Sequence, residues 1–204
     1  MLNLTDFSDP IRTFAIMVVA AQLIGAVATF KLRRDRRVGG GSLFMLGYVG
    51  VMIGSQTSEL FVPALIPGVL GLAAGMGVFI WARVTIHGRY FSYINSRDVP
   101  EFVCSDGPYR WVRHPFYSSY LLALVGTTVM FPNPITAAGC VVAYLSFNSA
   151  AAFEENKFTH SVVAGEYVAY VRRTGRFVPR FPRVTVSTPD PLPDSRDGPR
   201  PGAG

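Results

Sequence analysis

Charged residues are scarce in this chain, and cysteine is scarcer still. Of its 204 residues 16% are charged, against about 25% in an average soluble domain. The two cysteines, Cys104 and Cys140, stand in unlike surroundings and share no spacing typical of metal ligands, so we expect neither a disulfide framework nor a metal site. Basic residues are not interleaved with base-stacking aromatic residues, so the net charge of +6 does not indicate a nucleic-acid partner.

A glycine-rich nucleotide-binding loop is also missing. Gly71, Gly75 and Gly77 lie inside an apolar stretch with no strand before them, whereas a phosphate-binding loop needs a strand on one side and a helix on the other. Gly71 and Gly75 instead have the spacing that lets two helices approach closely. The sequence therefore predicts helix packing here and contains no Rossmann-type cofactor fingerprint.

Long apolar blocks are what the chain has in abundance, and half of its residues are hydrophobic. A membrane-spanning helix needs roughly 20 mostly apolar residues. Five stretches suit this role: 11–30, 42–61, 67–81, 115–131 and 135–153. Lys and Arg cluster after the first, third and fifth stretches and are missing from the other connections, which puts the N-terminus outside and the C-terminus in the cytoplasm. The sequence therefore predicts an all-α, multi-pass integral membrane protein with about five spans.

These patterns divide the chain into three regions. Residues 1–82 hold the first three spans, and residues 83–180 hold a cytoplasmic loop, a two-span helical hairpin and a C-terminal helix. Residues 181–204 are rich in Pro and Gly with few apolar residues, so we expect a disordered tail. The middle region carries the polar motifs, and it is the predicted catalytic region.

The chemistry is concentrated in the run GPYRWVRHPFY, from Gly107 to Tyr117, which opens directly into the fourth apolar stretch. Polar groups fixed at a membrane are costly and usually functional. The next turn is centred on Asn133 and lies roughly 20 residues from both His114 and Glu154, which is about 30 Å along a helix each way. Both ends of the hairpin therefore return to the same, cytoplasmic face. This brings together Arg113, His114, Tyr117, Glu154 and Glu155.

Local geometry limits what this site could hold. Pro115 suits the first position of a helix, which places Arg113 and His114 at a helix N-terminus, where an anion is favoured. The two glutamates could hold an ammonium group or a sugar diol. Aromatic faces for stacking come from Tyr109, Trp111, Phe116 and Tyr117. S-adenosylmethionine has groups to match all of these, but a phosphorylated dinucleotide would also suit an arginine beside a helix N-terminus.

Several of these residues also have a purely structural interpretation. Tyr and Trp are common in the aromatic belt at a membrane interface, which is the alternative for Trp111. Glu154 and Glu155 could form a solvated helix end, as adjacent charges usually do. For the segment 113–115 the functional interpretation is favoured.

The motifs resemble those of the isoprenylcysteine carboxyl methyltransferase and phospholipid methyltransferase superfamily, which are small integral-membrane methyltransferases with a C-terminal catalytic region. The resemblance covers about residues 80–180. It rests on Gly107-Pro108-Tyr109, Arg113-His114-Pro115 with Tyr117, Glu154-Glu155, and the segment GEYVAYVRRTGRFVP from Gly165 to Pro179. Ser119 is a departure, because the family often has glycine there. It either narrows the approach to the cofactor or is simply tolerated.

The resemblance implies an enzyme that moves a methyl group from S-adenosylmethionine to a lipophilic acceptor from the bilayer, such as an isoprenylcysteine carboxylate or a lipid amine. It implies a cofactor pocket lined by Tyr109, Arg113, His114, Pro115, Tyr117, Glu154 and Glu155. It also implies that the next segment closes over the cofactor and positions the acceptor through Glu166, Tyr167, Tyr170 and Arg173. An NADPH-dependent membrane reductase of the sterol-reductase type, which shares a related RHP-x-Y motif, is the first alternative. A non-catalytic scaffold or transporter is the second.

Overall fold

The computed structural model describes residues 10–29, 40–86 and 100–180, and these are helical apart from short connections. The elements are α1 Pro10–Thr29, α2 Gly40–Thr57, the 3-10 helix η1 Val62–Ala64, α3 Leu65–Ile86, the 3-10 helix η2 Gly107–Arg110, α4 Pro115–Met130, α5 Pro134–Thr159 and α6 Ala164–Arg173. Over the described ranges the only β pairing is an isolated parallel bridge between Val112 and Gly175. This confirms the all-α prediction.

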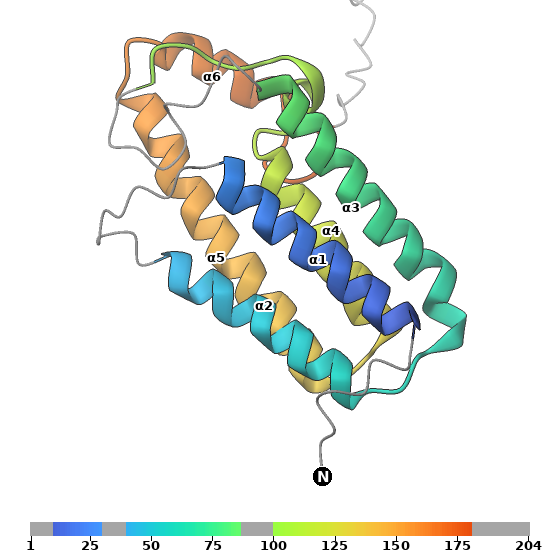
Figure 1. Ribbon diagram of the computed structural model, residues 1–204. Helices are drawn as coiled ribbons and strands as arrows, with labels where there is room; N and C mark the ends of the chain where they lie inside the picture. The colour runs from blue at the N-terminus through green and yellow to red at the C-terminus, as the bar shows by residue number, and fades with distance from the viewer. Residues whose placement is uncertain (1–9, 30–39, 87–99, 181–204) are drawn as a thin grey trace, which may run out of the picture.

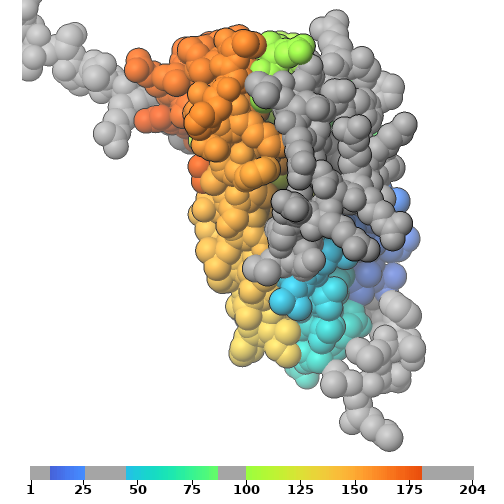
Figure 2. Space-filling model, turned by 90° about the vertical axis from the view of Figure 1, so that its left-hand side faces the viewer, coloured from blue at the N-terminus to red at the C-terminus, as the bar shows by residue number. Residues whose placement is uncertain are grey.

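The five long helices form one bundle in which successive helices reverse direction (Figure 1). The most extensive packing is between α3 and α4 and between α2 and α5. Figure 2 shows α5 along one side of the molecule, with α2 beside its lower half and α6 over its far end. The short helix α6 therefore lies at the end of the bundle where α3 and α5 finish and α4 begins.

Close helix packing in the bundle depends on glycine. A Cβ at Gly75 of α3 would lie 2.7 Å from the carbonyl oxygen of Ser119 in α4, and one at Gly71 would lie 3.2 Å from the Cα of Gly126. Any larger residue would push the two helices apart. The predicted packing role of Gly71 and Gly75 is confirmed.

Two stretches are long and apolar enough to cross a membrane, Val62–Ile86 and Pro134–Thr159, among the residues that the structure describes. Only 28% and 33% of their apolar windows are buried inside the protein, and Leu70 and Leu145 are among the apolar side chains that face outward. The core helices of a soluble protein would be covered instead. The five crossings and their orientation stay a prediction, and part of its basis, the basic residues of 31–37 with Arg89 and Arg97, lies outside the described residues.

Two helices extend beyond their predicted ends. Helix α3 continues to Ile86 and so runs through the boundary predicted at residue 82. Helix α5 continues to Thr159, which places Glu154 and Glu155 inside the helix rather than after it. The predicted ends are set by where the apolar residues stop. A helix can continue past that point when its polar residues find partners. The tail 181–204, predicted to be disordered, lies outside the described residues.

Candidate active site

The segment before α4 is held against the end of α3 by a glycine. Gly107 begins η2 with a φ of +54°, a conformation that side chains with a Cβ rarely adopt. A Cβ at this position would also collide with the hydroxyl of Thr85 and approach Trp81 Nε1 to 3.1 Å. Glycine thus lets η2 dock on α3, and the chain then turns into α4 with Pro115 as its first residue and His114 as its N-cap.

A second segment joins it from the far side of α6. We call residues 174–177 the C-terminal strap. The amide of Gly175 donates to the carbonyl of Trp111 at 3.2 Å, and Gly175 and Arg176 accept from the amides of Arg113 and His114 at 2.8 and 3.1 Å. The hydroxyl of Ser118 adds a bond to the carbonyl of Phe177 at 2.7 Å. The strap is therefore fixed to the N-terminus of α4 by its backbone.

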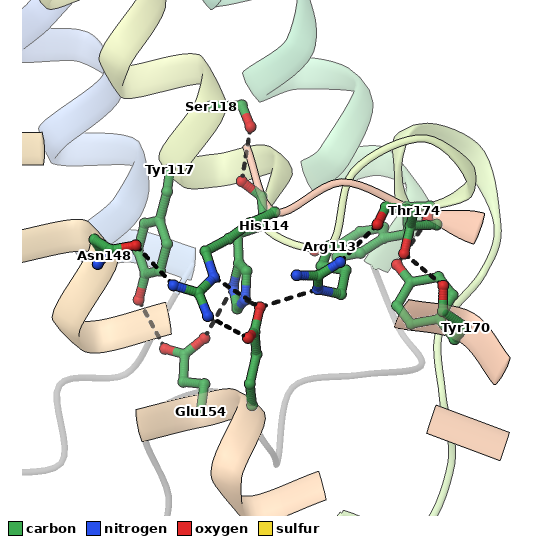
Figure 3. Close-up of polar contacts among 11 residues, drawn as sticks. Arg113, His114, Tyr117, Ser118, Asn148, Glu154, Tyr170 and Thr174 are labelled. Carbon is green, nitrogen blue, oxygen red and sulfur yellow. Dashed lines mark hydrogen bonds and ion pairs between the residues drawn. The ribbon is translucent and has the colours of Figure 1, made fainter. Parts of the chain in front are cut away.

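Glu155 of α5 accepts from both segments. Figure 3 shows the polar cluster around it, with Arg113, His114 and Glu154 labelled. Glu155 Oε1 lies 2.9 Å from Arg113 Nε, 3.2 Å from His114 Nε2 and 3.1 Å from Arg176 Nε, and its Oε2 lies 2.6 Å from Arg176 Nη2. The side chains of Arg113 and Glu155 are only 11% and 15% exposed, so solvent screens this cluster weakly. One carboxylate thus joins α5, the start of α4 and the strap.

Glu154 has a different set of partners. Tyr117 donates its hydroxyl to Oε1 at 2.7 Å, and His114 Nδ1 lies 3.4 Å from Oε2. Because Glu155 takes the other ring nitrogen, His114 bridges the two carboxylates, and only the protonated imidazole can donate to both. Burial alone would lower the pKa of His114, but its hydrogen bonds to Glu154 and Glu155 raise it above the ordinary value.

Aromatic rings cover the apolar side of this cluster. The ring of Tyr117 stacks on His114 with centroids 5.4 Å apart and on Phe147 of α5 at 5.0 Å. Phe177 of the strap meets the rings of His114 and Tyr117 edge to face. The polar ends of His114 and Tyr117 are therefore fixed in direction by packing.

The hairpin prediction is confirmed, because Arg113, His114 and Tyr117 do meet Glu154 and Glu155. The alternative of a solvated helix end is wrong for the glutamates. Arg113 is partly engaged by the protein itself: besides Glu155 it donates to the carbonyl of Thr174 at 2.6 Å, and its role toward a cofactor stays a prediction. Two of its guanidinium nitrogens, Nε and Nη1, thus hold Glu155 and the strap.

Of the four residues predicted to position the acceptor, all on α6, three lie apart from the carboxylate cluster: Glu166, Tyr170 and Arg173. Tyr170 is buried and donates to the carbonyl of Tyr109 at 2.6 Å. Arg173 lies over the ring of Tyr170, 5.7 Å from its centroid, and Glu166 is exposed. A cavity of about 570 Å³ opens beside Arg173, which lines it together with Ser105, Asp106, Gly107 and Arg110.

Tyr109 has a buried hydroxyl that makes no hydrogen bond within the described part of the chain. Its side chain is 8% exposed, and burial, followed by Cys104, Tyr170 and Glu154, raises its pKa. A buried unpaired hydroxyl is rare and often marks a place for a ligand or an ordered water. This residue was predicted to contact the cofactor, and its hydroxyl has the capacity to do so.

Sequence reasoning missed two polar residues. Arg176 lies inside the segment that carried the resemblance, and its Nη1 donates to Asn148 at 2.7 Å. Asn148 stands seven residues before Glu155, so the two share one face of α5, a helical spacing that could have indicated it.

Ser119 belongs to the helix packing and not to this cluster. It is fully buried, its hydroxyl donates to the carbonyl of Phe116, and its own carbonyl abuts Gly75 of α3. The structure therefore favours the alternative in which Ser119 is simply tolerated in place of glycine, and not the one in which it narrows the approach to the cofactor.

Known proteins match the second half of this architecture. Residues 69–160 match the profile of the isoprenylcysteine carboxyl methyltransferase (ICMT) family. Protein-S-isoprenylcysteine O-methyltransferase B of Arabidopsis thaliana is 35% identical over 95 residues, which is 45% of this chain and 48% of that protein. The cobalt-zinc-cadmium resistance protein CzcN of Cupriavidus metallidurans is 28% identical over 114 residues, 56% of this chain and 48% of that protein.

A more distant relative is the protein-S-isoprenylcysteine O-methyltransferase of Saccharomyces cerevisiae, 26% identical over 94 residues, 45% of this chain and 39% of that protein. The chain spans about half the length of the curated relatives it matches. The matched region contains η2, α4 and α5 with both glutamates, whereas α6 and the strap lie beyond it. Motifs and profile agree on this region, in which residues 69–160 of the chain resemble the isoprenylcysteine carboxyl methyltransferase family.

Proposed function

We propose that this protein is an S-adenosylmethionine-dependent methyltransferase of the membrane, and that its acceptor is lipophilic, with an S-prenylated cysteine carboxylate as the first candidate. The observation that carries the proposal is the cluster of His114, Tyr117 and Glu154 inside the region that matches the family. The names of the matched relatives favour this function over a reductase.

The residues present fit the methyl donor. Glu154 is a carboxylate for an ammonium group or a ribose diol, and Tyr117 and His114 are stacked rings that could face a purine or a sulfonium. The buried hydroxyl of Tyr109 has a free hydrogen-bonding capacity. When bound, S-adenosylmethionine supplies an activated methyl group on a positively charged sulfur, so no protein nucleophile is needed.

The protein's contribution would then be to position the reactants and exclude water. Tyr117 is held by stacking on Phe147 and by an edge-to-face contact with Phe177, and its hydroxyl donates to Glu154. Tyr170 ties α6 to η2 and so places Arg173 at the edge of the cavity beside Arg110. In this proposal the basic rim of that cavity meets the acceptor, and the cytoplasmic side supplies the methyl donor.

The proposal is tested by calorimetric titration of the protein in detergent or nanodiscs with S-adenosylhomocysteine and, separately, with NADPH. We expect binding of the first and none of the second. Release of S-adenosylhomocysteine should then be measured with an S-farnesylated cysteine derivative and with phosphatidylethanolamine, which distinguishes a carboxylate acceptor from an amine. Binding of NADPH alone, or no turnover with either acceptor together with no S-adenosylhomocysteine binding, would contradict it.

A further inference from the structure

The two adjacent glutamates of α5 have different partners, although they are neighbours in sequence. Glu155 contacts three cationic or cation-forming side chains, Arg113, His114 and Arg176. Glu154 contacts the uncharged hydroxyl of Tyr117 and the second nitrogen of His114. Only one of the two carboxylates is therefore committed to holding arginines.

Arg176 makes the most extensive contact with Glu155. Its Nε and Nη2 approach the two carboxylate oxygens at 3.1 and 2.6 Å, which is the side-on fork that makes arginine–carboxylate pairs directional. Its Nη1 donates to Asn148 Oδ1 at 2.7 Å, so the guanidinium lies along one face of α5. Arg176 comes from the strap, beyond the region that matches the family.

We propose that Arg176 is a positioning residue that acts through Glu155: by holding this carboxylate on the side of Arg113 and the strap, it leaves Glu154, His114 and Tyr117 as the ligand-facing part of the site. This inference rests on the proposed function for what the ligand is, but not for the geometry. In this arrangement Glu155 holds the protein segments together and Glu154 faces the ligand.

Because the groups around Glu155 are charged, the positioning role of Arg176 can be tested without a ligand, through the pKa of His114. Facing it are Arg113 and His114 from the start of α4, Arg176 from the strap and the Tyr167 ring from α6, with Glu154 beside it on α5. Removing the positive charge of Arg176 leaves Glu155 to be shared by Arg113 and His114 alone. His114 should then hold its proton to higher pH, because a nearby cation has been removed.

If Arg176 had a purely structural role, it would act only by docking the strap against the rest of the protein. Ser118 offers a matched control, because its hydroxyl bonds the carbonyl of Phe177 and contributes no charge to the cluster. Ser118→Ala loosens the strap and leaves the fork intact. Arg176→Lys keeps the charge but cannot form the two parallel bonds.

The experiment is an NMR titration of His114 in histidine-labelled protein, together with calorimetry of S-adenosylhomocysteine binding. For Arg176→Gln we expect the His114 titration to move upward by about one pH unit, and the affinity to fall by about tenfold, as is typical when an orienting partner is lost. Arg176→Lys should titrate like the wild type but bind more weakly. Ser118→Ala should change neither quantity.

An unchanged titration and affinity in Arg176→Gln would overturn the proposal, and so would an equal shift in Ser118→Ala. If Arg176→Gln does not fold, Arg176→Lys decides: wild-type affinity in that variant overturns the role of the fork. If the wild type itself does not bind S-adenosylhomocysteine, the proposed function fails, and the His114 titration still tests the positioning role by itself.

Discussion

Both ends of the α4–α5 hairpin are joined to the rest of the bundle, but by different kinds of interaction. At the turn, Asn133 caps α5 by accepting from the amide of Ile135 at 2.7 Å and donates to the Thr57 hydroxyl at 2.9 Å. At the other end, Glu155 collects charged groups from two distant segments. The turn is held by neutral hydrogen bonds, whereas the site end carries more charge than a helix end needs for folding.

The difference indicates where function lies. A neutral cap is worth about 1 kcal/mol and leaves nothing for a ligand to use. A half-buried cluster of charges is a weak source of net stability, because desolvation offsets much of the attraction. Among the residues that the structure describes, the charged cluster lies at the site end of the hairpin, which is better explained by a ligand than by folding.

The largest effect is expected at Glu155. Glu155→Ala leaves Arg113, Arg176 and His114 facing each other without their shared carboxylate, which should destabilise the protein by about 3 kcal/mol and abolish S-adenosylhomocysteine binding. Thermal unfolding in detergent and calorimetry measure the two effects. Glu154→Ala is the comparison, and it should lose binding while keeping most of the stability. Equal stability losses in the two variants would show that the glutamates do not differ.

The pH dependence should come from the site end as well. The pKa of His114 is raised in the folded protein, so its stabilising contribution is complete below the unfolded value of about 6.5 and is lost as pH rises through the folded pKa. The melting temperature should therefore fall as pH increases across this window. His114→Gln should remove this step, and persistence of the step in that variant would assign it to another group.

Sequence reasoning reached the hairpin because its ends are set by counting: Pro132, Asn133 and Pro134 mark the turn, and equal helix lengths return the ends to one face. The same counting placed Glu154 and Glu155 opposite His114. It could not place Arg176, because the path of the chain through α6 depends on packing of Tyr170 against η2, a contact between residues 61 apart. Nor could it foresee that Arg113 donates to both Glu155 and the carbonyl of Thr174.

At the turn, Asn133→Ala should cost about 1 kcal/mol through loss of the helix cap, without changing the affinity for S-adenosylhomocysteine. Asn133→Asp is the matched control, because it keeps an oxygen for the amide of Ile135 but loses the donor to Thr57. It should lie between the wild type and Asn133→Ala in stability. A loss of cofactor affinity in either variant would mean that the two ends are coupled along α5.

The smallest effect is expected at Ser119, one turn into α4 from the site and yet part of the bundle packing. Its hydroxyl bonds within its own helix and its carbonyl meets Gly75, so nothing about it faces Glu154. Ser119→Gly should lower stability by about 0.5 kcal/mol through helix propensity alone, and leave the S-adenosylhomocysteine affinity unchanged in calorimetry. Tighter binding in this variant would revive the idea that the serine narrows the approach to the cofactor. Unchanged binding would mean that the site ends near the start of α4. Tyr117 would then belong to the site, because its hydroxyl reaches Glu154, whereas Ser119 would belong to the helix packing, because its carbonyl meets Gly75 of α3.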